Sequence, residues 1–207
     1  MSDRNSNARM ESAFNNARTK FEQDYSLEVM KQKFPEYIGM MDRFGKLIGE
    51  NGKVLDAGCG HGRDIRHFND IGLNAVGIDI AEDLLEDASR KGLEVAKMDV
   101  RDLSFDDETF DGIWCNSVLH FLNPAAGDMQ QALKELTRIL KTGGVLYINF
   151  KLGKGETMRE DYEPSLRQFH LPESAIKEVL NNFPLKKIHS EKAPEMNTVS
   201  LFLKKTG

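Results

Sequence analysis

Apolar and polar positions alternate along the chain with two different periods. Residues 34–48 carry apolar side chains at helical spacing, which predicts a helix that ends between Gly49 and Gly52. Amphipathic stretches further along predict helices near 65–71, 81–88 and 129–140, the last one stopped by Gly143 and Gly144. Short apolar runs between these stretches predict strands at 54–57, 75–78, 95–98, 110–115 and 145–150.

This alternation of strands and helices is typical of a parallel sheet with helices on both faces. The last part of the chain differs, because a helix near 175–182 precedes two strands, 185–189 and 199–203, with no helix between them. Parallel neighbours need a crossover connection, so these two strands are predicted to be antiparallel. The predicted fold class is therefore α/β, a Rossmann-like sheet of seven mostly parallel strands with one antiparallel strand.

The length of 207 residues favours a single domain, 1–207. Within it we expect an N-terminal helical cap at 1–50, a ligand-binding core at 51–151, and a C-terminal helix and strand pair at 173–207. The first 12 residues are rich in Asn, Ser and charge, which predicts disorder. Residues 152–172 form a long connection with two glycines, and we expect a lid-like loop there.

The most informative segment is the glycine-rich turn between the first predicted strand and the next helix. Residues 56–62 place Gly58, Gly60 and Gly62 at every second position after Asp56. Such glycines let the backbone approach a ligand closely, and the turn directs helix N–H groups toward it. With the carboxylate of Asp56 at the strand end, the turn suits a nucleotide-like, partly cationic ligand. A turn without a ligand is the alternative interpretation.

Composition and charge narrow the range of partners. The chain has 40% apolar and 29% charged residues, as globular proteins do. Its net charge of −5 and pI near 5.6 offer no basic surface for a phosphate backbone, so we expect a small-molecule partner and no nucleic acid. No apolar run reaches membrane-spanning length and the N-terminus is polar, so we expect a cytoplasmic monomer or homodimer without membrane contact. Cys59 and Cys115 lack the spacing of metal ligands, and no metal is expected.

The glycine turn differs from the dinucleotide-binding pattern G-x-G-x-x-G, which would require glycine at the position of Arg63. Its D-x-G-x-G-x-G pattern resembles motif I of the class I S-adenosylmethionine (SAM) dependent methyltransferases. The resemblance extends over residues 53–151 and includes Asp79, Met98-Asp99-Val100 and the segments 110–114 and 140–147. Residues 150–156 are similar to those of small bacterial, tellurite-resistance-like methyltransferases, which implies a small-molecule acceptor.

The resemblance implies SAM as the cofactor, bound beyond the carboxyl ends of the strands. Asp79 would accept hydrogen bonds from the ribose hydroxyls, although an aspartate there can instead cap the next helix. Asp99 would accept from the adenine amino group, with the Val100 backbone beside it, although a solvated turn aspartate is equally compatible. The predicted cofactor-binding residues are Asp56, Gly58, Cys59, Gly60, Arg63, Asp64, Asp79, Ile80, Asp99, Val100, Asn116 and Ser117.

Methyl transfer from a sulfonium needs alignment and exclusion of water rather than a protein nucleophile. If the acceptor is a protonated amine or a hydroxyl, a base must free its lone pair, and His120 is the candidate catalytic residue. In its apolar segment, His120 is equally compatible with a packing or loop-ordering role. Tyr25, Tyr37, Arg167 and His170 could reach an acceptor only if the flanking segments fold over the site.

Three functions fit these observations. The first is SAM-dependent methyl transfer to a small molecule by direct in-line displacement. The second is a SAM-binding sensor or partner subunit without catalysis. The third is an NAD-binding Rossmann domain, against which the spacing of the glycines argues.

Overall fold

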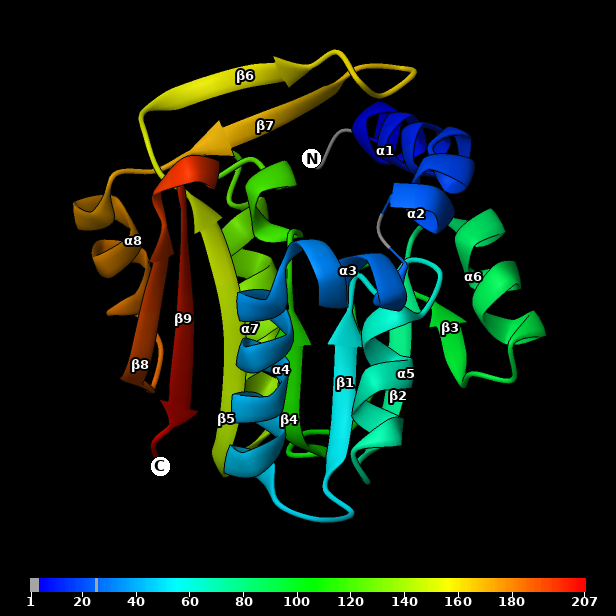
Figure 1. Ribbon diagram of the computed structural model, residues 1–207. Helices are drawn as coiled ribbons and strands as arrows, with labels where there is room; N and C mark the ends of the chain where they lie inside the picture. The colour runs from blue at the N-terminus through cyan, green and yellow to red at the C-terminus, as the bar shows by residue number, and fades with distance from the viewer. Residues whose placement is uncertain (1–3, 25) are drawn as a thin grey trace.

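The computed structural model describes residues 4–24 and 26–207. In these ranges helices precede the first strand, and strands and helices then mostly alternate (Figure 1). The helices are α1 (Arg4–Asn16), α2 (Arg18–Asp24), α3 (Leu27–Lys33), α4 (Pro35–Ile48), α5 (Arg63–Asp70), α6 (Glu82–Arg90), α7 (Asp128–Ile139) and α8 (Glu173–Leu180), with short 3-10 helices η1 (Leu119–Phe121) and η2 (Pro194–Met196). The strands are β1 (Lys53–Ala57), β2 (Asn74–Asp79), β3 (Val95–Lys97), β4 (Phe110–Cys115), β5 (Leu140–Lys151), β6 (Gly155–Arg159), β7 (Leu166–His170), β8 (Leu185–Ala193) and β9 (Thr198–Lys205).

The main sheet of the described chain has seven strands in the order β3-β2-β1-β4-β5-β9-β8. Strands β1 to β5 pair with one another in parallel, whereas β9 is antiparallel to both β5 and β8. The predicted fold class is confirmed, including the single reversed strand. The chain runs outward from β1 to β3 and then returns to β4 on the other side of β1. Ligands of open α/β sheets bind where the strand order reverses in this way.

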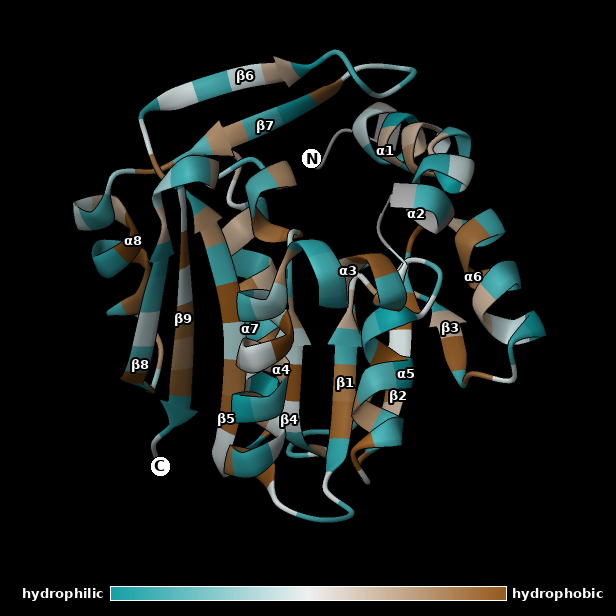
Figure 2. Cartoon of the chain, in the orientation of Figure 1, coloured by the Kyte–Doolittle hydropathy of each residue, from teal (hydrophilic) through white to brown (hydrophobic). Residues whose placement is uncertain are grey.

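Two helical layers cover the sheet. Helices α4 and α5 lie on one face, and α7 and α8 lie on the other (Figure 1). The strands carry the apolar positions between these layers, as Figure 2 shows by hydropathy. On the α4 face the rings of Trp114 and Tyr147 are stacked with their centroids 3.6 Å apart. In the described ranges no helix combines the length and the apolar character needed to cross a membrane.

The N-terminal prediction of disorder is wrong for residues 4–12, which belong to α1; residues 1–3 lie outside the described ranges. Met10 and Ala13 of this helix are buried against Leu166 of β7. The side-chain amide of Asn7 also donates to a carboxylate oxygen of Asp99 at 3.1 Å. The sequence of this helix is too polar to predict it. Contacts with distant segments stabilise the helix, and the local pattern does not show them.

The segment 152–172 also differs from the predicted loop, because it contains the antiparallel hairpin of β6 and β7. Leu166 and Gln168 are buried while Arg167 between them is exposed, so the strand alternates between an inner and an outer side. The hairpin lies above the carboxyl ends of the central strands, at the same end of the molecule as α1 (Figure 1). The residues that join β6 to β7 contain no Asn-Gly or Asp-Gly pair, the usual sequence signal of a tight hairpin turn. For this reason the sequence indicated a loop.

The end of α7 is a further correction. The helix ends at Ile139 and β5 begins at Leu140, so Gly143 and Gly144 lie inside a strand rather than stopping a helix. A Cβ at Gly144 would lie 2.8 Å from the carbonyl oxygen of Asp111, so this position has no room for a side chain. The β4–β5 register shifts nearby, and glycines accommodate such irregular pairing.

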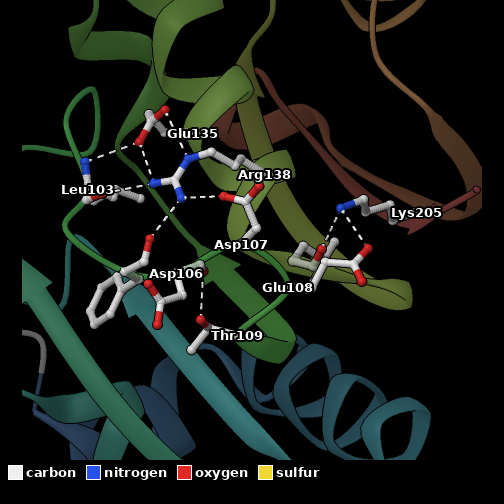
Figure 3. A network of polar contacts seen from close by, with 10 residues as sticks. Leu103, Asp106, Asp107, Glu108, Thr109, Glu135, Arg138 and Lys205 are labelled. Atoms are coloured by element: carbon white, nitrogen blue, oxygen red, sulfur yellow. Dashed lines mark hydrogen bonds and ion pairs between the residues drawn. The ribbon is translucent and has the colours of Figure 1, made fainter.

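The segment before β4 is held against α7 by Arg138, a residue of that helix (Figure 3). Arg138 donates to the carbonyl oxygens of Leu103 at 2.8 Å and Phe105 at 2.7 Å. It also forms ion pairs with Glu135 and Asp107, at 2.8 Å each. The polar groups of this segment are thus paired within the protein, whereas a cavity lies at the carboxyl ends of the central strands.

Candidate cofactor and acceptor site

A cavity of about 390 Å³ lies at the carboxyl ends of the central strands. Side chains of α1, α4 and the β6–β7 hairpin contribute to its walls. We distinguish two parts of it. The glycine-turn end is lined by residues from the segments 58–64, 78–80 and 98–101. The β5 end is lined by Phe14, His120, Phe121, Lys151, Arg159 and Tyr162.

The turn after β1 has the backbone shape that its glycines allow. Gly58, Gly60 and Gly62 have φ values of +87°, +53° and +82°, which side-chain-bearing residues rarely adopt. A Cβ at Gly58 would lie 2.2 Å from Cγ2 of Val118. The turn therefore needs glycine for its conformation, and at Gly58 also for its contact with the segment after β4.

Asp79, at the end of β2, connects this turn to α6. One carboxylate oxygen accepts from the backbone N–H of Gly60 and the other from that of Ala81, at 2.9 Å each. Burial raises the pKa of Asp79 despite these hydrogen bonds. Asp79 does not cap α6, because the N-cap residue is Ala81 and no side chain caps the helix; Asp79 instead fixes Ala81 just before the helix. It also lines the cavity, as a ribose-binding carboxylate would.

Asp56 is the first acidic residue of the motif, and it is buried in β1. Its Oδ2 atom has no hydrogen-bond partner among the described residues. Burial, followed by the neighbouring carboxylate of Asp64, raises the pKa of Asp56 well above its usual value. A carboxyl group in this state would gain from a nearby cation.

Asp64 is the centre of a buried network. Arg63 Nε donates to it at 2.6 Å and Trp114 Nε1 at 3.1 Å, and the Tyr37 hydroxyl donates as well. Burial raises the pKa of Asp64, but the charge and hydrogen bonds of Arg63 and the other donors outweigh it and bring the pKa below its usual value. The sequence named Arg63, Asp64 and Tyr37 separately, and the structure brings them together. Trp114 was not predicted to contact them.

Asp99, after β3, has more partners than the sequence indicated. Arg101 donates to both of its carboxylate oxygens, at 2.9 and 2.6 Å, and Asn7 of α1 donates to Oδ2. Burial alone would raise the pKa of Asp99, but the hydrogen bonds and charge of Arg101 outweigh burial, and the net pKa is below its usual value. The carboxylate therefore stays ionised. Asp99 lines the cavity beside Val100, and its adenine-binding role stays a prediction. The role of Arg101 had no local sequence signal.

Asn116 and Ser117 follow β4 and are positioned by a residue of β5. Asn149 accepts from the backbone N–H of Ser117 at 2.7 Å and donates to Oδ1 of Asn116 at 2.8 Å. All three line the cavity. Asn149 was missed, although a lone amide in the apolar run 145–150 is a usable signal for a polar role.

His120 lies at the β5 end and is only 4% exposed. Its Nδ1 atom has no hydrogen-bond partner in the described part of the chain. Burial, with the nearby charges of Lys151, Arg159 and His170, lowers the pKa of His120 to about 3. A neutral imidazole with so low a pKa is a weak proton acceptor, so the structure favours a hydrogen-bonding role over general-base catalysis.

Aromatic side chains from three distant segments meet at the same end. The ring of Phe14 in α1 lies 5.3 Å from that of Phe121 in η1 and 5.6 Å from that of Tyr162 in the hairpin. The flanking segments therefore do fold over the site. Of the four residues that depended on this folding, Tyr37 lines the cavity, Arg167 and His170 do not, and Tyr25 lies outside the described ranges.

Comparisons with known proteins agree with this geometry. Residues 55–148 match the family model described as a methyltransferase domain. Over 137 residues the chain is 29% identical to malonyl-[acyl-carrier protein] O-methyltransferase of Salmonella typhimurium, covering 63% of this chain and 53% of that protein. Over 99 residues it is 35% identical to tRNA (carboxymethyluridine(34)-5-O)-methyltransferase of Arabidopsis thaliana, covering 46% and 23%. The chain thus spans about half the length of the first relative and less of the second.

Among solved structures, a SAM-dependent methyltransferase from Clostridium acetobutylicum has the same fold, with a TM-score of 0.72 at 16% identity, covering 93% of this chain and 100% of that chain. The chain thus shares the fold of that methyltransferase, and its residues 55–148 match a methyltransferase domain. The domain match supports an enzyme of the methyltransferase class.

Proposed function

We propose that this protein transfers the methyl group of SAM to a small-molecule acceptor. The observation that carries the proposal is the continuity of the cavity, which joins the glycine turn and its carboxylates to a second, aromatic and basic end. One end suits the cofactor and the other can hold an acceptor next to it. The resemblance to small tellurite-resistance-like methyltransferases supports the same acceptor class.

The described residues fit the cofactor. Gly58 and Gly60 line the cavity with positive φ values, and a Cβ at Gly60 would meet only Leu84, at 3.9 Å, so a ligand can approach the backbone there. The carboxylate of Asp79, which lines the cavity, suits a ligand with hydroxyls. Oδ2 of Asp56, which has no partner among the described residues, is instead buried in β1, and Asp56 does not line the cavity. We assign cofactor binding to the predicted set from Asp56 to Ser117, with Arg101 and Asn149 as residues that position Asp99 and Asn116.

Bound SAM supplies a methyl group activated by a positively charged sulfur. The work left to this chain is to align the acceptor with that methyl group and to exclude water. The cap helices and the β6–β7 hairpin, which meet through Phe14, Phe121 and Tyr162, are placed to do both. We therefore propose that the hairpin acts as the lid that the sequence predicted at 152–172.

A small acceptor is favoured over a nucleic acid for two reasons. Residues of the hairpin segment and α1, including Phe14 and Tyr162, line the second end of the cavity. The net charge of −5 also disfavours binding to a phosphate backbone, although one relative is a tRNA methyltransferase.

Two measurements test the proposal. Calorimetric titration is expected to show micromolar binding of SAM and S-adenosylhomocysteine and no detectable binding of NAD. Incubation with labelled SAM and a fractionated metabolite extract is expected to give a labelled small molecule together with S-adenosylhomocysteine. Binding of SAM without turnover in any fraction would favour a sensor or partner subunit, and labelling of tRNA alone would contradict the acceptor class.

A further inference from the structure

We propose that the acceptor carries an anionic group, a carboxylate or a phosphate, which Lys151 binds at the β5 end of the cavity. The inference rests on the proposed function and specifies the chemistry of its acceptor. Two independent features of the structure support it: a half-buried lysine that no described carboxylate pairs with, and a buried histidine nitrogen with no hydrogen-bond partner among the described residues.

The first feature is the position of Lys151. Tyr147, Asn149 and Lys151 occupy alternate positions of β5, and all three line the cavity. Tyr147 pairs with Trp114, and Trp114 pairs with Asp56, so these residues form one row across the sheet. Lys151 lies four residues beyond that row and two strands from β1, roughly 13 Å along the strand and roughly 10 Å across the sheet. The glycine turn lies beyond the same row at the end of β1, so it is the distance across the sheet that separates Lys151 from it.

The charge around Lys151 is unbalanced. Its Nζ donates to the carbonyl oxygen of Met196 at 3.0 Å, and none of its described contacts is with a carboxylate. The acidic side chains that line the cavity in the described ranges are Asp64, Asp79 and Asp99, which all belong to the glycine-turn end. Burial, followed by the charge of Arg159, lowers the pKa of Lys151. An anion bound beside Lys151 would offset both the burial of the ammonium and its repulsion by Arg159, and would stabilise the ammonium form.

Lys141, at the other end of β5, shows the contrast. It forms an ion pair of 2.7 Å with Asp111. The same strand thus carries Lys141, which has a carboxylate partner and does not line the cavity, and Lys151, which lines the cavity and has no carboxylate partner in the described ranges. Lys141 therefore provides a matched control for Lys151.

The second feature is His120. Its buried Nδ1 has no partner in the described part of the chain, and its side chain lines the same end of the cavity as Lys151. A buried polar atom in this state is normally satisfied by a ligand or an ordered water. A neutral imidazole and an ammonium that line one cavity can each donate a hydrogen bond to an anionic ligand bound between them.

The methionine carboxylate of the cofactor is the alternative partner for Lys151. The position of Lys151, two strands from β1 and roughly 10 Å across the sheet, argues against it. Binding measurements separate the two sources, because one predicts an effect of Lys151 on the cofactor and the other does not.

The experiment uses benzoate and inorganic phosphate as anionic probes and benzamide as the uncharged counterpart of benzoate. Each is titrated calorimetrically into the full chain, with and without saturating S-adenosylhomocysteine. At least one anion is expected to bind at least tenfold more tightly than benzamide. Lys151→Gln should remove this preference, whereas Lys151→Arg and Lys141→Gln should retain it. Benzoate and phosphate also distinguish the two kinds of anionic group.

Several results would overturn the inference. The first is the absence of anion binding to the wild-type protein, and the second is an unchanged anion affinity in Lys151→Gln. The third is a tenfold loss of S-adenosylhomocysteine affinity in Lys151→Gln, which would assign Lys151 to the cofactor. Circular dichroism and thermal unfolding confirm that each variant is folded. If the wild-type protein fails to bind S-adenosylhomocysteine, the proposed function fails, and the titrations without it still decide whether Lys151 binds anions.

Discussion

The two ends of the cavity are built in different ways. The glycine-turn end consists of residues at and after the ends of β1, β2 and β3, where carboxylates have partners nearby in the chain, such as Arg101 for Asp99. The β5 end combines α1, η1, β5 and the hairpin, which are far apart in the sequence, and no described residue provides a carboxylate partner for Lys151 there. If the two ends hold the cofactor and the acceptor as proposed, cofactor binding depends mainly on local backbone geometry, whereas acceptor binding depends on how distant segments pack.

The largest expected effect tests the glycine-turn end. Gly58→Val introduces a branched side chain at a φ of +87°. Its Cβ alone would lie 2.2 Å from Cγ2 of Val118. We expect loss of detectable SAM binding in calorimetry. The free energy of unfolding should also fall, by about 1–3 kcal/mol, because backbone strain and the contact act together.

Gly72→Val is the matched control, because Gly72 has φ +88° but a Cβ at this position would have no atom within 4 Å of it. This variant should lose some stability and keep its SAM affinity. Normal SAM binding by Gly58→Val would contradict the assignment of the glycine turn to the cofactor.

The second prediction separates the two ends. Replacing residues 157–168 with a short Gly-Ser linker removes most of the hairpin, including Tyr162, but leaves the glycine turn untouched. SAM affinity should stay within a factor of a few, while methyl transfer should fall by about 100-fold or more because the acceptor is no longer enclosed.

Met158→Ser is the control for this variant, since Met158 belongs to the same hairpin and is 44% exposed. It should leave methyl transfer near the wild-type rate. If the linker variant also turned over acceptor normally, the hairpin would not be a lid.

The third prediction concerns Asp79. Its removal in Asp79→Ala leaves the N–H groups of Gly60 and Ala81 without their acceptor and removes a predicted ribose contact. SAM binding should weaken by roughly 1–3 kcal/mol, the range for hydrogen bonds to charged groups. Asp83→Ala, at an exposed position of α6, should leave it unchanged. An unaltered affinity in Asp79→Ala would mean that this carboxylate only holds the start of the helix.

The smallest effect is expected at His120 and depends on pH. Its pKa is lowered to about 3 by burial, whereas an unfolded histidine has a pKa of about 6.5. Between these values the unfolded chain binds a proton that the folded protein does not, so the free energy of unfolding decreases as the pH falls. Relative to His120→Gln, the wild-type protein should lose about 2 kcal/mol between pH 7 and pH 5.

Urea unfolding curves of both proteins at pH 7, 6 and 5 provide this measurement. The same pH dependence in both would show that His120 is protonated as readily in the folded protein as in the unfolded chain. Its proposed role as a neutral hydrogen-bonding partner at the β5 end would then be wrong.

What the sequence by itself determined was local. Hydrophobic periodicity indicated the strands β1 to β5 and their helices, because each pattern repeats within a single element. The missing helix between the last two strands indicated the reversed strand. The glycine turn with Asp56, and Asp79 at the next strand end, indicated the cofactor site, because that chemistry depends on backbone shape within a few residues.

Only the tertiary structure decided the rest. Helix α1 is polar and the segment 152–172 has no short turn signal, so each acquires its structure from contacts with the other and with η1. The pairing of Asp99 with Asn7, and the presence of Lys151 and His120 at one end of a cavity, join residues that no local pattern connects. Such contacts depend on how the sheet and its cap pack in three dimensions, and periodicity along the chain does not encode them.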